Sequence, residues 1–264
     1  MKILVCTIAA LLLAVTPTRA AAGTPYATDI GQETALIAGG AALLGAGLRA
    51  QRGFRPLSPQ ELAALDPRTL PAPDRSAVRR WSPAANRASD VLAWTVALAP
   101  LGLTASGPGR DQAGRLVLMY AQTALLTDGA VHLLKNVVRR PRPLAYNPDP
   151  RIPDELRLSP TARRSFPSGH TARTFAAMVF FAGVHERLVP EADHGRVWGG
   201  CLAAAAATGT LRWAAGRHFP TDILAGAALG AAVGWLVPRL HERGGGEVGG
   251  TPAPAARLAF GFAF

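Results

Sequence analysis

The 264-residue sequence predicts an all-α protein, an antiparallel bundle of about six helices embedded in a membrane. The chain is 49% hydrophobic and only 17% charged, a composition between that of a soluble enzyme and that of a polytopic membrane protein. Five apolar segments are too long for strands and show no alternation of polar and apolar residues, so a helix suits them better than a strand.

The first 22 residues are typical of an export signal. Lys2 supplies the positive start, Ile3–Val15 form an apolar run, and small residues around Ala20 offer a cleavage site. The alternative is an anchor that is not cleaved. In either case the chain enters a membrane or crosses it.

Residues 23–89 combine one apolar helix with a polar stretch. Thr34–Leu48 is rich in Gly and Ala and predicts a helix, whereas residues 52–87 are rich in Pro and Arg. Within the polar stretch, the sequence Ser-Pro-Gln-Glu at 58–61 predicts a short helix that ends at Leu65.

Residues 90–240 form the predicted core, and residues 241–264 a flexible tail. The core segments reach only 15 to 18 residues before a charge in several cases, and about 20 residues span a bilayer, so a soluble bundle is the alternative. Their small residues would let helices pack closely. The five segments are Asp90–Ala105, Leu116–Val138, Thr171–Val189, Val197–Ala214 and Asp222–Val237.

Three short motifs lie at the ends of these segments. In an antiparallel bundle the helix ends that carry them fall on one side, so residues far apart in sequence meet there. The motifs are Lys135-x6-Arg142-Pro143, Pro167-Ser168-Gly169-His170 and Arg212-x5-His218-x3-Asp222.

The residue types in the motifs suit phosphoryl transfer. A phosphoryl group in transfer carries negative charge on its equatorial oxygens. Lys135, Arg142 and Arg212 can bind those oxygens, the arginines through two hydrogen bonds each. Gly169 lets its backbone N–H approach an oxygen closely, and Ser168 can donate a hydrogen bond or cap the following helix.

In these motifs the chain resembles the type 2 phosphatidic acid phosphatase (PAP2) superfamily, which includes bacterial class A acid phosphatases and membrane lipid phosphatases. The vanadium haloperoxidases are similar in the same motifs. The resemblance covers roughly residues 90–240 and implies a PAP2/haloperoxidase-like helical fold. Leu211 departs from the family pattern, which usually has Ser there. This change leaves the ionisable groups intact and affects only a packing or hydrogen-bonding detail.

The resemblance implies a role for each motif residue. His218 would attack phosphorus and form a phosphohistidine, while Asp222 would hold its ring. His170 would protonate the leaving group and then activate water. The phosphate would be bound by Lys135, Arg142, Ser168, Gly169 and Arg212. The fixed cations take the place of a metal, so neither a metal nor a cofactor is expected.

The predicted function is a metal-independent phosphatase acting on phosphomonoesters or diphosphates, with lipid phosphates as the expected substrates. The alternatives are a soluble periplasmic nonspecific acid phosphatase, a vanadate-dependent haloperoxidase, and a scaffold with a degenerate site. The net charge of +11 first suggests nucleic acid, but no basic helix carries interleaved aromatic residues. Anionic headgroups or phosphate substrates therefore fit better. The oligomeric state stays open.

The predicted location is a bacterial inner membrane with the site facing the periplasm, and the alternative is a soluble periplasmic protein. The arginines of residues 52–87 would instead be expected in the cytoplasm by the positive-inside rule. The basic loop at 144–165 is expected to rim the pocket. Asp128 and His132 are expected to pair with each other or with neighbours in the bundle, or to form a network next to the site. Five further arginines could bind a second anionic group or face solvent or headgroups: Arg139, Arg140, Arg163, Arg164 and Arg173.

Overall fold

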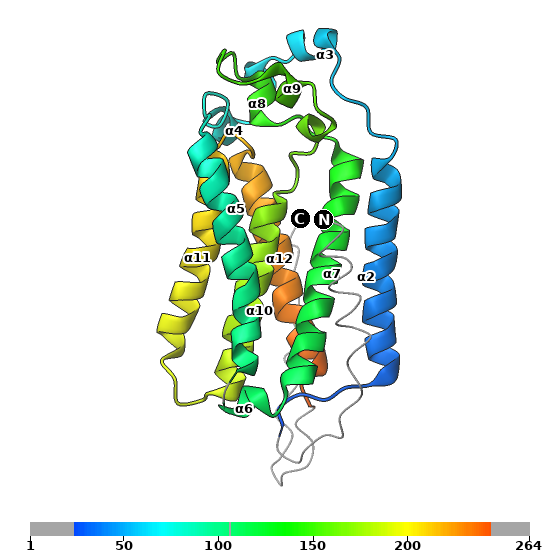
Figure 1. The fold of residues 1–264 in the computed structure, drawn as a ribbon, viewed down its shortest axis with the longest axis vertical. Helices are drawn as coiled ribbons and strands as arrows, with labels where there is room; N and C mark the ends of the chain where they lie inside the picture. The colour runs from blue at the N-terminus through cyan, green and yellow to red at the C-terminus, as the bar shows by residue number, and fades with distance from the viewer. Residues whose placement is uncertain (1–23, 106, 244–264) are drawn as a thin grey trace, which may run out of the picture.

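The computed structural model describes residues 24–105 and 107–243, and within them it contains helices and no strand. Consecutive long helices run in opposite directions along one axis (Figure 1). The predicted all-α antiparallel bundle is thereby confirmed. The predicted export signal at 1–22, and residues 244–264 of the predicted tail, lie outside the described residues. The long helices are α2 (Ile30–Gln51), α5 (Pro83–Leu98), α7 (Ala113–Val138), α10 (Gly169–Leu188), α11 (His194–Ala214) and α12 (Pro220–His241).

Several helices begin at side-chain caps that the sequence contains. Asp29 accepts a hydrogen bond from the backbone of Gln32 at the start of α2, and Asp193 caps α11 in the same way. Ser82 caps α5, and the next residue is a proline at the first helical position. This Ser-Pro pair explains why α5 starts seven residues before Asp90, where the apolar segment begins.

The helix predicted to start at 58–61 and to end at Leu65 forms α3 (Pro59–Ala63), which ends two residues earlier than expected. Ser58 and Glu61 make reciprocal hydrogen bonds of a capping box, at 3.1 and 2.8 Å. Short elements of residues 52–87 and 144–165 gather at the end of the bundle where α2 ends and α5 begins, at the top of Figure 1. They are α3, η1 (Pro67–Thr69), α4 (Ala72–Arg75), α8 (Pro143–Tyr146), α9 (Asp154–Arg157) and η3 (Pro160–Arg163).

The segment predicted as a helix to Ala105 changes form before its end. α5 ends at Leu98 and continues as the 3₁₀ helix η2 (Ala99–Thr104), which contains Pro100. Proline lacks the N–H that an α-helix needs and restricts the residue before it. The short helix α6 (Gly107–Arg110) follows at the same end of the bundle.

Helices α10 and α12 approach each other backbone to backbone. Gly226, Gly230 and Gly234 repeat every four residues on α12 and lie against the backbone of α10. A Cβ atom added to Gly230 would overlap the carbonyl oxygen of Ala172. Small residues allow such contact between helices, and the contact fixes the start of α10 against the start of α12.

The outer surface of the bundle carries large apolar side chains. Val91, Trp94 and Leu98 are exposed on one face of α5, as expected for positions three and four residues apart on a helix. Trp235 and Leu236 are exposed on α12. Among the described residues, α12 is the one helix whose length and apolar composition suffice to cross a membrane.

Candidate active site

The four long helices that carry or border the motifs have termini at the end of the bundle where the short elements gather (Figure 1). Helices α7 and α11 end there, and α10 and α12 begin there. The eight residues predicted from the motifs lie on these termini or directly beside them, so the antiparallel bundle brings them to one end. They are Lys135, Arg142, Ser168, Gly169, His170, Arg212, His218 and Asp222.

His218 lies in the connection between α11 and α12 and is 1% exposed. Its Nε2 accepts a hydrogen bond from Nη1 of Arg142 at 3.2 Å, which leaves the ring proton on Nδ1. Burial, reinforced by the positive charges of Arg142 and Lys135, holds the pKa of His218 well below its usual 6.5. The ring is therefore neutral, and its unprotonated nitrogen faces the cations.

Asp222 lies beside His218 but does not form the short hydrogen bond expected from the motif. Its Oδ2 is 3.7 Å from Nδ1 of His218, and that nitrogen makes no hydrogen bond with any described residue. The same oxygen accepts hydrogen bonds from the backbone N–H of Phe219 at 2.9 Å and from the hydroxyl of Ser165. The carboxylate of Asp222 thus faces the Nδ1 proton of His218 without bonding to it, because Phe219 and Ser165 hold the carboxylate in place.

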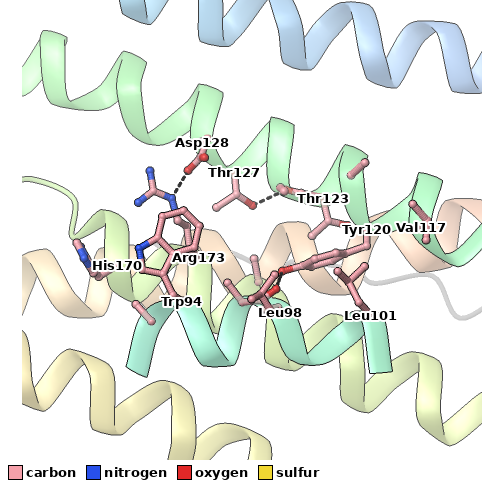
Figure 2. A pocket seen from close by; sticks show the side chains of 16 residues that line it. Trp94, Leu98, Leu101, Val117, Tyr120, Thr123, Thr127, Asp128, His170 and Arg173 are labelled. Atoms are coloured by element: carbon pink, nitrogen blue, oxygen red, sulfur yellow. Dashed lines mark hydrogen bonds and ion pairs between the residues drawn. The ribbon is translucent and has the colours of Figure 1, made fainter. Parts of the chain in front are cut away.

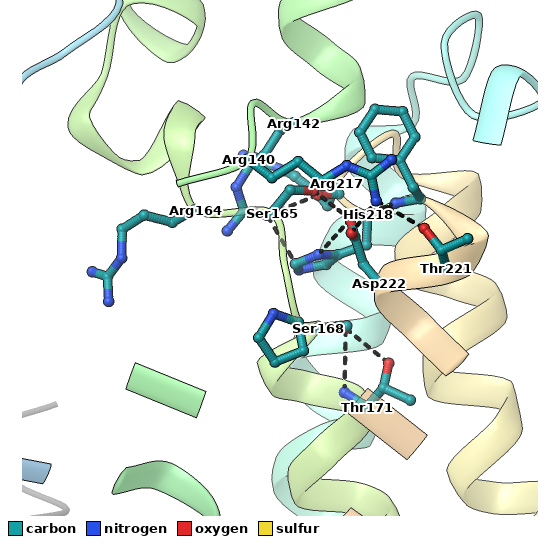
Figure 3. Close-up of polar contacts among 12 residues, drawn as sticks. Arg140, Arg142, Arg164, Ser165, Ser168, Thr171, Arg217, His218, Thr221 and Asp222 are labelled. Carbon is teal, nitrogen blue, oxygen red and sulfur yellow. Dashed lines mark hydrogen bonds and ion pairs between the residues drawn. The ribbon is translucent and has the colours of Figure 1, made fainter. Parts of the chain in front are cut away.

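Arg140 and Ser165 hold Asp222 in place, and the motifs do not include them (Figure 3). Nη1 of Arg140 lies 2.6 Å from the other carboxylate oxygen of Asp222, and Nη2 lies 2.6 Å from Asp74. The sequence indicated Arg140 only as one of several arginines near the motifs. Its position also depends on the ion pair with Asp74 of α4, and no sequence pattern predicts that Asp74 lies next to Arg140.

Arg142 is fixed in an extended segment between α7 and α8. Its Nε donates to the carbonyl of Thr161 and its Nη1 to the carbonyl of Arg217, both at 2.9 Å. Burial and the neighbouring Arg212 and Arg217 lower its pKa to about 9, so the side chain stays charged at neutral pH. These cations repel one another, and an anion bound among them would relieve that repulsion.

Lys135 is buried in the last turn of α7. Its Nζ donates to the carbonyl of Arg164 at 2.9 Å and to that of Pro167. Lys135 therefore stabilises the loop that leads into α10, and two of the three N–H donors of its ammonium group are used in hydrogen bonds to that loop. It lies near enough to His218 to lower that residue's pKa.

Arg212 is bound by α5, a contact that the sequence did not indicate. Its Nη1 lies 3.1 Å from oxygens of Asn86, Ser89 and Asp90. These three positions share one face of α5 because they are three and four residues apart. The available signal was the Ser-Pro helix start at 82–83, which places these polar residues on the same helix as the apolar segment.

His170 lies in the first turn of α10 and contacts the same carboxylate. Its Nε2 is 2.9 Å from Oδ1 of Asp90, the oxygen that Arg212 also contacts. Asp90 therefore joins the imidazole of one motif to the guanidinium of another.

Ser168 and Gly169 form the start of α10. Ser168 is its N-cap, accepting from the backbone of Thr171, and its hydroxyl lies 2.8 Å from that of Thr171 (Figure 3). The backbone N–H of Ser168 donates to the carbonyl of Asp222 at 2.9 Å. A Cβ atom on Gly169 would lie 3.3 Å from Val131, so the small residue suits a crowded junction.

Asp128 and His132 pair with neighbours and not with each other. Asp128 accepts from Nε of Arg173 at 2.6 Å. His132 lies 3.1 Å from Nη2 of Arg164, which points away from His218 (Figure 3). Of the two arginines, only Arg173 lines a cavity near the motif residues.

A cavity of about 320 Å³ begins at His170 and extends between α5, α7 and α10 (Figure 2). Its wall is mostly apolar and includes Trp94, Leu98, Leu101 and Tyr120. Trp94 and Leu98 are more than half exposed, so the cavity lies at the outer face of the bundle.

Within the described residues, no three His, Cys, Asp or Glu side chains group as metal ligands would. The expectation that neither a metal nor a cofactor is needed stays a prediction.

Comparison with known proteins identifies the family. The model of the PAP2 superfamily matches residues 114–245, half of the chain. No curated protein matches the sequence. One similar solved structure is that of a transmembrane PAP2-type phosphatidylglycerolphosphate phosphatase from Bacillus subtilis, with 21% identity and a TM-score of 0.44, over 76% of this chain and 94% of the other. The chain belongs to the PAP2 superfamily, and this membership supports a phosphatase of the PAP2 type.

Proposed function

We propose that the protein is a metal-independent phosphatase of lipid phosphates that works through a phosphohistidine. The observation that carries the proposal is the environment of His218. Its unprotonated Nε2 faces Arg142, with Lys135 and Arg212 close enough to lower its pKa. A neutral nucleophile directed at a group of cations suits attack on a phosphate anion.

In the first step the phosphate oxygens bind the cations and the Nε2 lone pair of His218 attacks phosphorus. A P–N bond forms as the P–O bond to the leaving group breaks; this group is an alkoxide in a monoester and a lipid monophosphate in a diphosphate. His170 gives the leaving oxygen its proton. The negative charge of the bound phosphate offsets the cations around His170, which favours the protonated imidazole. Asp222, 3.7 Å from Nδ1, stabilises the positive charge that develops on His218.

In the second step water attacks the phosphohistidine. His170, now neutral, takes a proton from the water, the P–N bond breaks, and His218 regains its lone pair. Inorganic phosphate leaves with the oxygen from water. No group beyond those of the chain, the substrate and water is required.

The cavity supports a lipid as the substrate. It begins at His170, has a mostly apolar wall, and lies at the outer face of the bundle. An acyl or prenyl chain would bury its surface there while its terminal phosphate reaches the cations. A water-soluble ester would leave this surface unused.

The exposed apolar residues of α5 and α12, together with the length of α12, support an integral membrane protein. We place it in a bacterial inner membrane with the motif end facing the periplasm. The apolar cavity would then lie at the level of the lipid chains.

Phosphate release from lipid phosphates, measured beside release from a water-soluble ester, tests the substrate class. The proposal expects a higher kcat/KM for the lipids, and activity in the membrane fraction. Preference for the soluble ester, with the protein in the periplasmic extract, would favour a nonspecific acid phosphatase instead. Peroxide-dependent bromination that requires vanadate would favour a haloperoxidase.

Trapping the intermediate tests the mechanism. Brief incubation with a ³²P-labelled substrate and acid-free quenching should leave label on the protein that is lost in acid and kept in alkali. A His218→Gln variant should carry no label and lose at least about 1,000-fold in kcat, because the nucleophile is gone. Label at another residue in wild type would exclude this nucleophile.

A further inference from the structure

The wall of the cavity contains one ion pair. Asp128 of α7 and Arg173 of α10 are its two charged members. Apart from the imidazole of His170, the other lining side chains are apolar or carry a hydroxyl (Figure 2). Arg173 is 34% exposed and Asp128 is 11% exposed. A charge beside an apolar cavity is costly unless it is paired, and Asp128 supplies that pairing.

The pair uses only part of the guanidinium. Nε of Arg173 donates to Oδ1 of Asp128 at 2.6 Å. The two terminal nitrogens of Arg173 make no hydrogen bond or ion pair with any residue from 24 to 105 or from 107 to 243. Figure 2 shows them directed away from the carboxylate. Their N–H donors remain available, in a fork that matches two phosphate oxygens.

The position of Arg173 relates it to the reacting phosphate. Arg173 follows His170 by three residues on α10, so both side chains lie on one helix face, and both line the cavity. Three residues rise about 4.5 Å along the helix. A lipid whose terminal phosphate reaches His218 and whose chain lies in the cavity would pass Arg173 directly after that phosphate.

We propose that Arg173 binds a second phosphate, located between the scissile phosphate and the lipid chain, and that in the free enzyme the carboxylate of Asp128 pairs with the guanidinium and competes with that phosphate. This inference rests on the proposed phosphatase function. The substrate class is a lipid diphosphate or a lipid that carries a phosphodiester next to its terminal phosphate. A lipid with a single phosphate offers Arg173 no partner.

Matched pairs of substrates test the proposal. One pair is a prenyl diphosphate and the prenyl monophosphate of the same chain length. The other is phosphatidylglycerolphosphate and phosphatidic acid with the same acyl chains. The measured quantity is the ratio of kcat/KM between the two members of each pair. Whichever pair responds identifies the source of the second phosphate.

Arg173→Gln should lower this ratio by roughly 10- to 100-fold in at least one pair, mainly through KM, because charge-assisted hydrogen bonds are lost. Arg173→Lys should lower it less, since the charge remains. Asp128→Asn should leave the ratio unchanged or raise it, because the competing carboxylate is gone. Arg196→Gln is the matched control at an exposed position on α11 and should change nothing.

Equal losses for both members of each pair, or no loss in either, after Arg173→Gln would overturn the proposal. If that variant fails to fold, a ratio lowered by Asp128→Asn would overturn it as well. Failure of the wild-type protein to release phosphate from all four lipids would instead contradict the proposed function.

Discussion

The carboxylate of Asp90 lies 2.9 Å from Nε2 of His170 and 3.1 Å from Nη1 of Arg212. Asp90 belongs to α5, outside the segment that matches the family model. One side chain thus sets the relative position of two motif residues, the proposed proton donor and a proposed phosphate ligand.

Asp90→Asn should lower kcat/KM by roughly 10- to 100-fold, because His170 and Arg212 lose the charge that holds them. Asp90→Glu should recover part of the loss. In a His170→Asn background the Asp90→Asn change should cost much less, since residues that act as a unit are not additive. Steady-state kinetics of the double-mutant cycle check this, with the exposed Asp154→Asn as control. Additive losses would show that Asp90 does not act through His170.

The acid limb of kcat/KM should lie below pH 6.5. The reactive form of His218 is neutral, and its lowered pKa keeps it neutral as the pH falls. Arg142→Gln should lose about 100-fold or more in activity, because a phosphate ligand is removed. It should also move the acid limb upward by about one pH unit or more, since a positive charge beside Nε2 is lost.

The pH profile of kcat/KM from pH 4 to 8 measures this shift. The exposed Arg151→Gln is the control and should keep the wild-type limb. An Arg142→Gln limb at or below the wild-type position would contradict the electrostatic role.

Gly230→Ala should destabilise the bundle by about 1 to 3 kcal/mol, because the new methyl group would overlap the Ala172 carbonyl and push α12 from α10. Thermal unfolding in detergent should show a Tm lower by roughly 3 to 10 °C. Gly199→Ala on α11 is the matched control, since its Cβ would meet nothing within 4 Å. Equal Tm values for the two variants would indicate that the α10–α12 contact is not tight.

Cysteine labelling tests the proposed orientation. In a chain whose two native cysteines are replaced by serine, Glu155→Cys lies on α9 at the motif end and Arg196→Cys at the opposite end of α11. Both native side chains are exposed. A maleimide that cannot cross the inner membrane should label Glu155→Cys in cells with a permeabilised outer membrane, and spare Arg196→Cys. The reverse pattern would place the motif end in the cytoplasm.

The helices could be predicted from the sequence because their apolar segments and end signals are local. The gathering of the motif residues follows from alternating helix directions. The contacts of Asp90 and Arg140 could not be predicted, because they depend on how α5 and α4 lie against the motif loops. The contact of Ser165 depends on how the loop before α10 lies against the start of α12. The 3.7 Å separation of His218 from Asp222 is likewise set by competing donors that only the fold brings near.

The exposed Trp94 and Leu98 place the cavity beside α5 at the flank of the bundle. In a bilayer, a lipid could therefore arrive sideways without leaving the membrane. Turnover would then follow the mole fraction of substrate among the lipids, and diluting it with inert phospholipid would slow the enzyme even when the bulk amount is unchanged.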